Sequence, residues 1–162
     1  MGAERKEQNL IEKLENGDII ELFKKSSDER SEFQFLSDKR FNDLMVPAKK
    51  RGAQVIRGTP EVIKHLDEQQ AASSCIGNIL MFRENVTISE ALEELRHFDQ
   101  NMLRMNNDKE ISLRTILNEI DAKRHVLNED TKHYHIPENE QNMLRKQLSW
   151  YERQLDEYME GG

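Results

Sequence analysis

The second half of the chain contains three successive segments in which apolar residues recur every three or four positions. The segments cover residues 87–105, 107–128 and 137–162, and this spacing gives each of them one apolar stripe on a helix. The stripes consist of Ile88, Ala91, Leu92, Leu95, Phe98, Met102 and Met105, then Leu113, Ile116, Leu117, Ile120 and Leu127, then Leu144, Leu148, Tyr151, Leu155 and Tyr158. Amphipathic helices of this length have to bury their apolar faces, so we expect the three helices to pack around a shared core.

Two short upstream segments have the length and composition of β-strands. They are residues 53–58 (AQVIRG) and 78–84 (NILMFRE), each with a short apolar centre. Between them, Thr59 and Pro60 have the types expected at the N-cap and the first position of a helix. The order is therefore helix, strand, helix, strand and three long helices. This order predicts a mostly helical α+β fold with a small β-sheet, not a parallel α/β sheet.

The chain divides into an N-terminal segment and one domain, which suits its length of 162 residues. Residues 1–36 are predicted to be a helical segment or linker, with one or two short helices between residues 3 and 25. Residues 37–162 are predicted to form the folded domain. Its first helix is expected to end between Pro47 and Gly52, because proline and glycine commonly mark the end of a helix.

The charge and the apolar content of the chain argue against some classes of partner. The formal net charge is −7, whereas binding to a phosphate backbone needs clustered Lys and Arg side chains. No apolar run approaches the roughly 18 residues of a transmembrane helix. The first residues, MGAERKEQNL, also lack the apolar core of a signal peptide. We therefore expect no nucleic-acid partner and no membrane span.

Acidic residues and a histidine follow a metal-ligand spacing on the first long helix. Glu93 and His97 are four residues apart, so their side chains project from the same side of the helix. Glu119, on the next helix, lies at the edge of an apolar stripe, where a buried carboxylate needs a partner. These three residues can supply ligands to one metal ion, with Glu94 placed as a general base. The alternative is that the charged residues from Glu93 to His97 form a hydrated helix face.

Other metal patterns in the sequence are weaker. Glu94 and His97 match one half of the E-x-x-H pattern of di-iron helix bundles, but Ala122 occupies the histidine position of the second half. His133 and His135, in the segment KHYHIP, either bind a metal in alternation or lie in a solvated turn. The chain has one cysteine, so a zinc site built from several thiolates is excluded.

The most specific pattern in the chain is E-E-x-x-H-x-x-Q at residues 93–100, followed by N-E-x-x-A at residues 118–122. With the flanking segments between Phe41 and Tyr158, these patterns make the chain resemble the zincin-like metallopeptidase toxin domains of bacterial polymorphic toxins and of some phage head-associated proteins. The second pattern is similar to the glutamate helix of gluzincins, which carries the third metal ligand. The resemblance implies a zincin-like fold over residues 37–162.

The resemblance also implies roles for individual residues. It maps Glu93, His97 and Glu119 onto the metal-ligand positions and Glu94 onto the catalytic base of a peptidase that acts on a protein or peptide substrate. The strand at residues 78–84 would be the sheet edge above the cleft, where a peptide could add as a further strand. Such a toxin would be a secreted or delivered effector without its own signal peptide, countered by a cognate immunity protein.

The competing expectation is a catalytically inactive zincin-like module in the cytoplasm, such as an interaction module, a phage structural appendage or an immunity-type partner. Glu93 stands where H-E-x-x-H has its first histidine. Two carboxylates and a neutral imidazole cancel the charge of a divalent ion, so a bound water would be less acidic than in a site with two histidines. The expected metal is Zn²⁺, but carboxylates are also harder ligands, so Mn²⁺ or Fe²⁺ would compete better against it than at a site with two histidines. The sequence leaves open whether the chain is an enzyme.

Overall fold

The computed structural model describes residues 33–161 of the chain. The helices predicted between residues 3 and 25, and most of the segment 1–36, lie outside the described residues. The described elements are, in order, α3 (Asp38–Lys50), β1 (Gln54–Arg57), α4 (Pro60–Glu68), β2 (Ser73–Ile76), β3 (Ile79–Phe82), α5 (Ile88–Leu103), α6 (Ile111–Asn128), the short 3-10 helix η2 (Asp130–Lys132) and α7 (Glu138–Gly161). They confirm the predicted mostly helical α+β fold with a small sheet.

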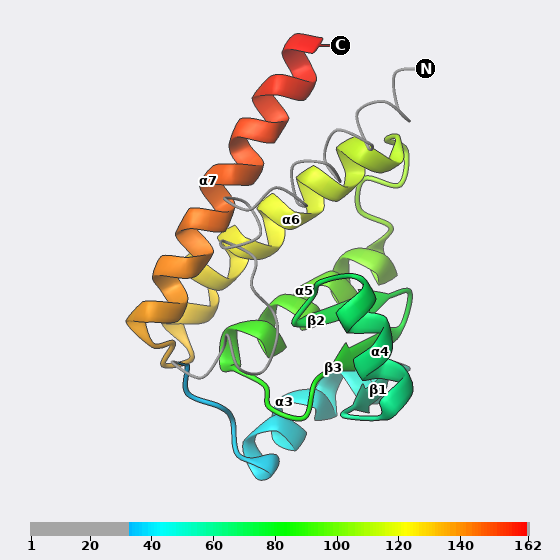
Figure 1. The fold of residues 1–162 in the computed structure, drawn as a ribbon, viewed down its shortest axis with the longest axis vertical. Helices are drawn as coiled ribbons and strands as arrows, with labels where there is room; N and C mark the ends of the chain where they lie inside the picture. Colours follow the sequence, from blue (N-terminus) through cyan, green and yellow to red (C-terminus); the bar gives the residue numbers. More distant parts are fainter. Residues whose placement is uncertain (1–32, 162) are drawn as a thin grey trace.

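The helix α5 joins the two parts of the described structure. Figure 1 shows α6 and α7 as a pair of long helices that extends away from the body formed by α3, α5 and the sheet. α5 contacts α6 on one side and the strands β2 and β3 on another. α3 packs against α5 and β1, and α4 packs against β3. Residues on α5 can therefore meet both the sheet and the long helices.

The three strands form a mixed sheet in the order β1-β3-β2. β1 runs parallel to β3, and β2 runs antiparallel to β3. β3, within the predicted strand at residues 78–84, is therefore the central strand, so the expectation that it forms the sheet edge is wrong. β2 was not predicted because Ser73–Ile76 contains few apolar residues. Its one sequence signal is the Gly-Asn pair that follows it, a pair typical of hairpin turns, and Gly77 has a φ of 61°.

Local sequence determines where α4 and α5 begin. Thr59 accepts a hydrogen bond from the backbone N–H of Val62 at 3.3 Å, and Pro60 lies in the first turn of α4. Thr87 and Glu90 form a capping box at the start of α5, in which each side chain accepts a hydrogen bond from the backbone N–H of the other residue. These side chains satisfy N–H groups that have no partner within the helix. The predicted starts of both helices are confirmed.

The start of α6 differs from the prediction. The helix expected from residue 107 begins at Ile111, four residues later. Asn106 has a left-handed backbone with a φ of 61°, which is incompatible with a helix at that residue. The guanidinium group of Arg114 then donates hydrogen bonds to the backbone carbonyls of Asn106, Asn107 and Lys109. These bonds hold the connection between α5 and α6 as a loop.

Apolar side chains form three clusters, so the expected core shared by the three long helices is confirmed only in part: Leu92 and Leu144 belong to the main cluster and Leu127 packs against it, whereas most of the α6 and α7 stripes form a separate one. The main cluster lies between α3, the sheet and α5 and reaches the end of α6 and the start of α7. It includes Leu36, Phe41, Met45, Leu80, Phe82, Leu92, Phe98, Val126 and Leu144. A second cluster lies between α6 and α7, and a third contains Val62, Leu66 and Met81 near α4. The stripe of α5 therefore faces the sheet, while Ile116 and Ile120 of the α6 stripe face α7. Met102 is 49% exposed, because it lies in the last turn of α5, beyond the main cluster.

The two faces of α6 are chemically different. Its contact with α7, the apolar α6–α7 interface, consists of Ile116, Ile120, Leu148, Trp150, Tyr151, Leu155 and Tyr158. Its contact with α5, the polar α5–α6 interface, consists of Glu93, Arg96, His97, Gln100, Glu119, Asp121 and Lys123. In the polar interface, Nε and Nη2 of Arg96 donate hydrogen bonds to the two carboxylate oxygens of Asp121 at 2.8 and 3.2 Å.

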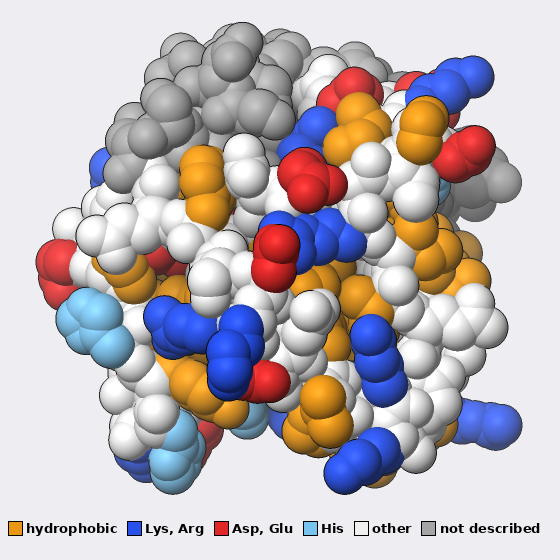
Figure 2. Space-filling model, turned by 90° about the horizontal axis from the view of Figure 1, so that it is seen from below, with side chains coloured by type: hydrophobic (Ala, Val, Ile, Leu, Met, Phe, Trp, Pro, Cys, Tyr) orange, Lys and Arg blue, Asp and Glu red, His pale blue; other side chains and the backbone are white. Residues whose placement is uncertain are grey.

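The surface mixes charged, polar and apolar side chains. Figure 2 shows the molecule from below, with Lys and Arg side chains at several separate positions next to apolar and acidic ones. This mixture is what a chain with 34% charged residues produces. Between residues 33 and 161, no helix combines the length and the apolar character that a bilayer crossing requires.

Candidate metal site

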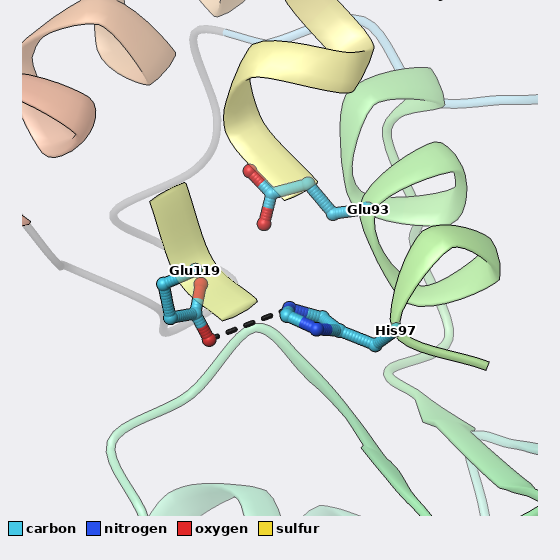
Figure 3. Close-up of side chains that lie close together, drawn as sticks. All are labelled: Glu93, His97 and Glu119. Atoms are coloured by element: carbon cyan, nitrogen blue, oxygen red, sulfur yellow. Dashed lines mark ion pairs between the residues drawn. The ribbon is translucent and has the colours of Figure 1, made fainter. Parts of the chain in front are cut away.

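Glu93, His97 and Glu119 point into one space between α5 and α6 (Figure 3). One donor atom from each residue lies within 4.8 Å of the other two. Nε2 of His97 is 3.4 Å from Oε1 of Glu119, the ion pair that is dashed in Figure 3. The group could hold a metal ion, and within residues 33–161 it is the only group of three or more His, Cys, Asp or Glu side chains with this geometry.

The charged residues at the start of this site do not form a hydrated helix face. The side chains of Glu93 and His97 are 14% and 15% exposed, and Glu94 is 5% exposed. Arg96 is covered as well, because it pairs with α6. The alternative of a solvated face is therefore wrong for these residues. They are covered because α5 packs against α6 and the sheet through this side as well as through its apolar stripe.

Gln100 fixes the orientation of the His97 ring. The side-chain amide of Gln100 donates hydrogen bonds from Nε2 to the backbone carbonyl of Asn118 and to Oδ2 of Asp121, both at 2.8 Å. Its carbonyl oxygen Oε1 lies 2.7 Å from Nδ1 of His97 and can only accept, so Nδ1 carries the proton. The other ring nitrogen, Nε2, is directed toward Glu119. A histidine anchored in this way is typical of metal ligands.

Lys123 places a positive charge directly at the carboxylates. Its Nζ donates a hydrogen bond to Oε2 of Glu119 at 2.8 Å and lies 3.5 Å from Oε2 of Glu93. The side chain is 3% exposed, and the ammonium group lies 5.2 Å from the ring centroid of Tyr151. Glu119 therefore contacts His97 through one oxygen and Lys123 through the other. Without a metal, two cationic side chains balance two carboxylates.

The charges at the site stabilise one another. Burial lowers the pKa of His97, but Glu119 and Glu94 outweigh this effect and raise the pKa to about 10. Burial raises the pKa of Glu119, but Lys123 and His97 bring it well below its usual range. Burial also lowers the pKa of Lys123, whereas Glu119 and Glu93 raise it above its usual value. In the metal-free protein at neutral pH, His97 and Lys123 are therefore protonated and Glu119 is ionised.

Glu94 is a buried carboxyl group next to the metal-ligand candidates. Its Oε2 accepts a hydrogen bond from Oγ of Ser73 in β2 at 2.5 Å. Burial raises the pKa of Glu94 to about 7, although His97 and Ser73 act in the opposite direction. A carboxyl group with a pKa near neutrality can both accept and release a proton at physiological pH. General bases need this property.

All four predicted site residues line one cavity of about 620 Å³. Its walls come from β2 and the residues just before it, from α5, from α6 and from residues 140–151 of α7. Residues 73–76 of β2 form one of these walls. Among the described residues β2 pairs only with β3, so its other edge takes part in no strand pairing there. The cavity therefore combines the ligand group, a buried carboxyl group and an outer strand of the sheet.

Three residues of the site were not assigned a role from the sequence. Gln100 is three residues after His97 and Lys123 is four residues after Glu119, so helical spacing could have indicated both contacts. Ser73 lies on the strand that was not predicted, and no sequence spacing connects it with Glu94. The pattern E-E-x-x-H-x-x-Q contained Gln100, but its function as the anchor of His97 depends on bonds to α6.

The other predicted metal patterns have no support in the structure. His133 and His135 are exposed and lie outside the ligand group. Ala122 is fully buried in α6 and has no side-chain donor for a second metal. The di-iron pattern and the histidine pair are therefore not part of the candidate site.

Comparisons of the chain with known protein families, with curated proteins and with solved structures found no match. Two carboxylates and one imidazole are ligands that Zn²⁺, Mn²⁺ and Fe²⁺ accept. The contacts of Gln100 with His97 and of Lys123 with Glu119 resemble the outer contacts that orient metal ligands. The residues present fit a single divalent ion.

Proposed function

We propose that the chain is a metal-dependent, peptidase-like effector domain. In this proposal Glu93, His97 and Glu119 hold one divalent ion, Zn²⁺ first and Mn²⁺ or Fe²⁺ as competitors, and Glu94 is the general base. The observation that carries the proposal is the convergence of a three-ligand group and a buried carboxyl group on one cavity. An interaction module has no need of a proton acceptor in this position.

The residues around the ligand group have the chemistry that peptide hydrolysis requires. A divalent ion bound there would supply Lewis acidity toward a carbonyl group and a water molecule. The hydroxyl group of Ser73 occupies Oε2 of Glu94, which leaves Oε1 to take the proton of the attacking water. Glu94 would then pass this proton to the leaving amine. Gln100 keeps the ring of His97 oriented throughout.

We infer that a peptide substrate would bind along β2. The sequence assigned this role to residues 78–84, but β3 is bonded on both sides and cannot accept another strand. β2 is the outer strand whose residues line the cavity, and an extended peptide could hydrogen-bond to its other edge. Delivery as a toxin and control by an immunity protein are supported only by the similarity of E-E-x-x-H-x-x-Q to toxin domains.

The test separates metal binding from proton transfer. The purified full chain is loaded with Zn²⁺, and its metal content and its cleavage of a mixture of unfolded peptides are measured. Glu94→Gln keeps the size of the side chain but cannot accept the proton. We expect this variant to keep its fold and its metal content while cleavage falls by about 10²–10⁴-fold. His97→Ala is expected to lose both metal and cleavage.

Two control variants show whether these losses are specific. Glu68→Gln changes an exposed carboxylate on α4, and His135→Ala removes an exposed histidine from the rejected histidine pair. Both are expected to behave like the parent chain. Cleavage by Glu94→Gln at the parent rate would overturn the role of Glu94. A parent chain that binds Zn²⁺ but cleaves no peptide would overturn the peptidase proposal.

A second candidate function is favoured by Lys123. Its ammonium group and the protonated ring of His97 together already neutralise Glu93 and Glu119, so the site is electrically neutral without a metal. This arrangement would suit an inactive zincin-like module that binds a protein partner through the same cavity. A parent chain without bound metal after equilibration with Zn²⁺, Mn²⁺ and Fe²⁺ would favour this second function.

A further inference from the structure

Among the described residues, Lys123 differs from the other cationic side chains near the ligand group because it contacts both carboxylates that would bind a metal. Its Nζ is 2.8 Å from Oε2 of Glu119 and 3.5 Å from Oε2 of Glu93. The stem of the side chain is buried, and Tyr151 lies beside the ammonium group. Because the ammonium group is shielded from solvent, water screens its interaction with the two carboxylates only weakly. The lysine was not part of the predicted site.

We propose that Lys123 is the resident cation of the site. Together with protonated His97 it balances Glu93 and Glu119 when no metal is bound, and it adds one positive charge beside the metal when a metal is bound. The inference rests on the proposed function, because it concerns the same ligand group. It assigns to Lys123 a positioning and electrostatic role rather than a contact with substrate.

The positive charge of Lys123 compensates for the negative charge that Glu93 adds where H-E-x-x-H has a neutral histidine. With a divalent ion, the carboxylates of Glu93 and Glu119 cancel both charges of the ion, and Lys123 then leaves the site with a net charge of plus one. A site with two neutral histidines and one carboxylate has this same net charge around a divalent ion. Lys123 thus restores the positive charge that is lost when a carboxylate replaces the first histidine.

Lys123 has two opposite effects on metal affinity, and their sizes differ. Its hydrogen bond orients Glu119, and removal of such an outer contact typically weakens metal binding by about 10–100-fold. Its charge repels the metal. At a separation of about 5 Å and an effective dielectric constant of about 20, this repulsion corresponds to more than 10³-fold in affinity. The repulsion is the larger effect, so we infer that the lysine lowers metal affinity.

The first experiment measures metal affinity in the full chain. Lys123→Met keeps the length of the side chain and removes its charge, and Zn²⁺ binding is measured by competition with a chelator of known affinity. We expect Lys123→Met to bind Zn²⁺ at least about tenfold more tightly than the parent. The matched control is Lys132→Met, which removes the exposed partner of Glu129 and is expected to leave the affinity unchanged.

The second experiment tests the metal-free protein, so it does not depend on metal loading. Lys123→Met leaves two carboxylates facing one protonated His97, and we expect its midpoint of thermal unfolding to fall by about 5 °C or more. Glu93→Gln in the same chain removes the excess negative charge. The double variant is expected to recover part of the loss. A double variant less stable than Lys123→Met would overturn the proposed charge balance.

The outcomes distinguish this inference from the function on which it rests. Tighter Zn²⁺ binding by Lys123→Met than by the parent supports the inference. If Lys123→Met binds Zn²⁺ and the parent binds none, the inference is supported and a metal-dependent function of the parent is overturned. Equal or weaker binding by the variant, with a parent that does bind, overturns the inference and leaves the proposed function standing. Absence of binding in both chains overturns the metal-dependent function and the role of Lys123 beside a metal, and the thermal unfolding experiment then decides the charge balance by itself.

Discussion

The two faces of α6 hold the molecule together in different ways. Toward α7, the helix buries Ile116 and Ile120 against Trp150 and other apolar side chains, and this burial is favourable without any particular geometry. Toward α5, the same helix presents charged and amide side chains, each of which needs a partner once it is removed from water. Buried ion pairs often contribute no more stability than apolar residues of similar size.

This difference indicates what each interface contributes. The apolar α6–α7 interface stabilises two long helices by removing apolar surface from water, without the need for specific polar partners. In the polar α5–α6 interface, burial of the charged groups costs desolvation free energy. Its members are nevertheless hydrogen-bonded in a connected arrangement from Arg96 through Asp121 and Gln100 to His97. Ionisable groups with shifted pKa values that line a cavity are typical of functional sites. We therefore expect the α7 side of α6 to contribute most of the stability, and the α5 side to carry the candidate functional groups.

The largest effect on stability is expected in the apolar interface. Trp150 is 2% exposed and packs edge-to-face against Tyr151 with ring centroids 4.9 Å apart. Trp150→Ala should lower the free energy of unfolding by about 3–5 kcal/mol, because it leaves a large cavity between the helices. Chemical denaturation of the metal-free chain measures this loss. Met102→Ala, at a half-exposed position on α5, should stay within about 0.5 kcal/mol of the parent. A loss below about 1 kcal/mol for Trp150→Ala would show that the apolar interface is not the main stabilising one.

A pH effect should distinguish the polar side of α5 from the apolar interface. The pKa of Glu94 is about 7 in the folded chain, against an ordinary value of 4.5, because the carboxyl group is buried. The folded state therefore holds this proton more tightly than the unfolded state. The resulting stabilisation is fully present below about pH 4.5 and is lost as the pH rises through about 7.

Glu94→Gln should remove this pH dependence from the metal-free protein. Between about pH 4.5 and pH 8, the parent should lose about 3 kcal/mol more stability than the variant, which corresponds to the shift of the Glu94 pKa. Denaturation curves at several pH values measure the difference. Glu68→Gln should follow the parent, since Glu68 is exposed. Parallel curves for Glu94→Gln and the parent would contradict the burial of an ionisable group at this position.

A smaller effect is expected from the pair formed by Arg96 and Asp121. Their side chains are 21% and 29% exposed, so water screens part of the interaction. Asp121→Asn should lower the free energy of unfolding by about 1–2 kcal/mol at pH 7. Burial raises the pKa of Asp121, but Arg96 and Gln100 lower it below its usual value, so the stabilisation is present above about pH 4 and lost as the pH falls.

A double-mutant cycle with Arg96→Met would isolate this pair from its neighbours. The two substitutions should be less than additive, because each one removes the same interaction. Additive losses would mean that the polar interface consists of independent contacts. The comparison between the two faces of α6 would then need a different explanation.

Several features of the fold could be predicted because they depend on neighbours within one helical turn. The caps of α4 and α5 and the stripes of α5, α6 and α7 follow from spacings of three or four residues. The pairing of Glu93 with His97 on one side of α5 has the same origin. That Glu119 reaches them needed a further assumption about the next helix, and the distance of 3.4 Å agrees with it.

The sequence by itself therefore determined the helices, their faces and the residues that could bind a metal. Only the tertiary structure decided that β3 is central, that β2 is an outer strand beside the cavity, and that the apolar residues divide into separate clusters. It also decided that Lys123 lies between Glu93 and Glu119. These features depend on which faces meet in space. Periodicity shows that a face is apolar or charged, but it does not identify the element against which that face packs.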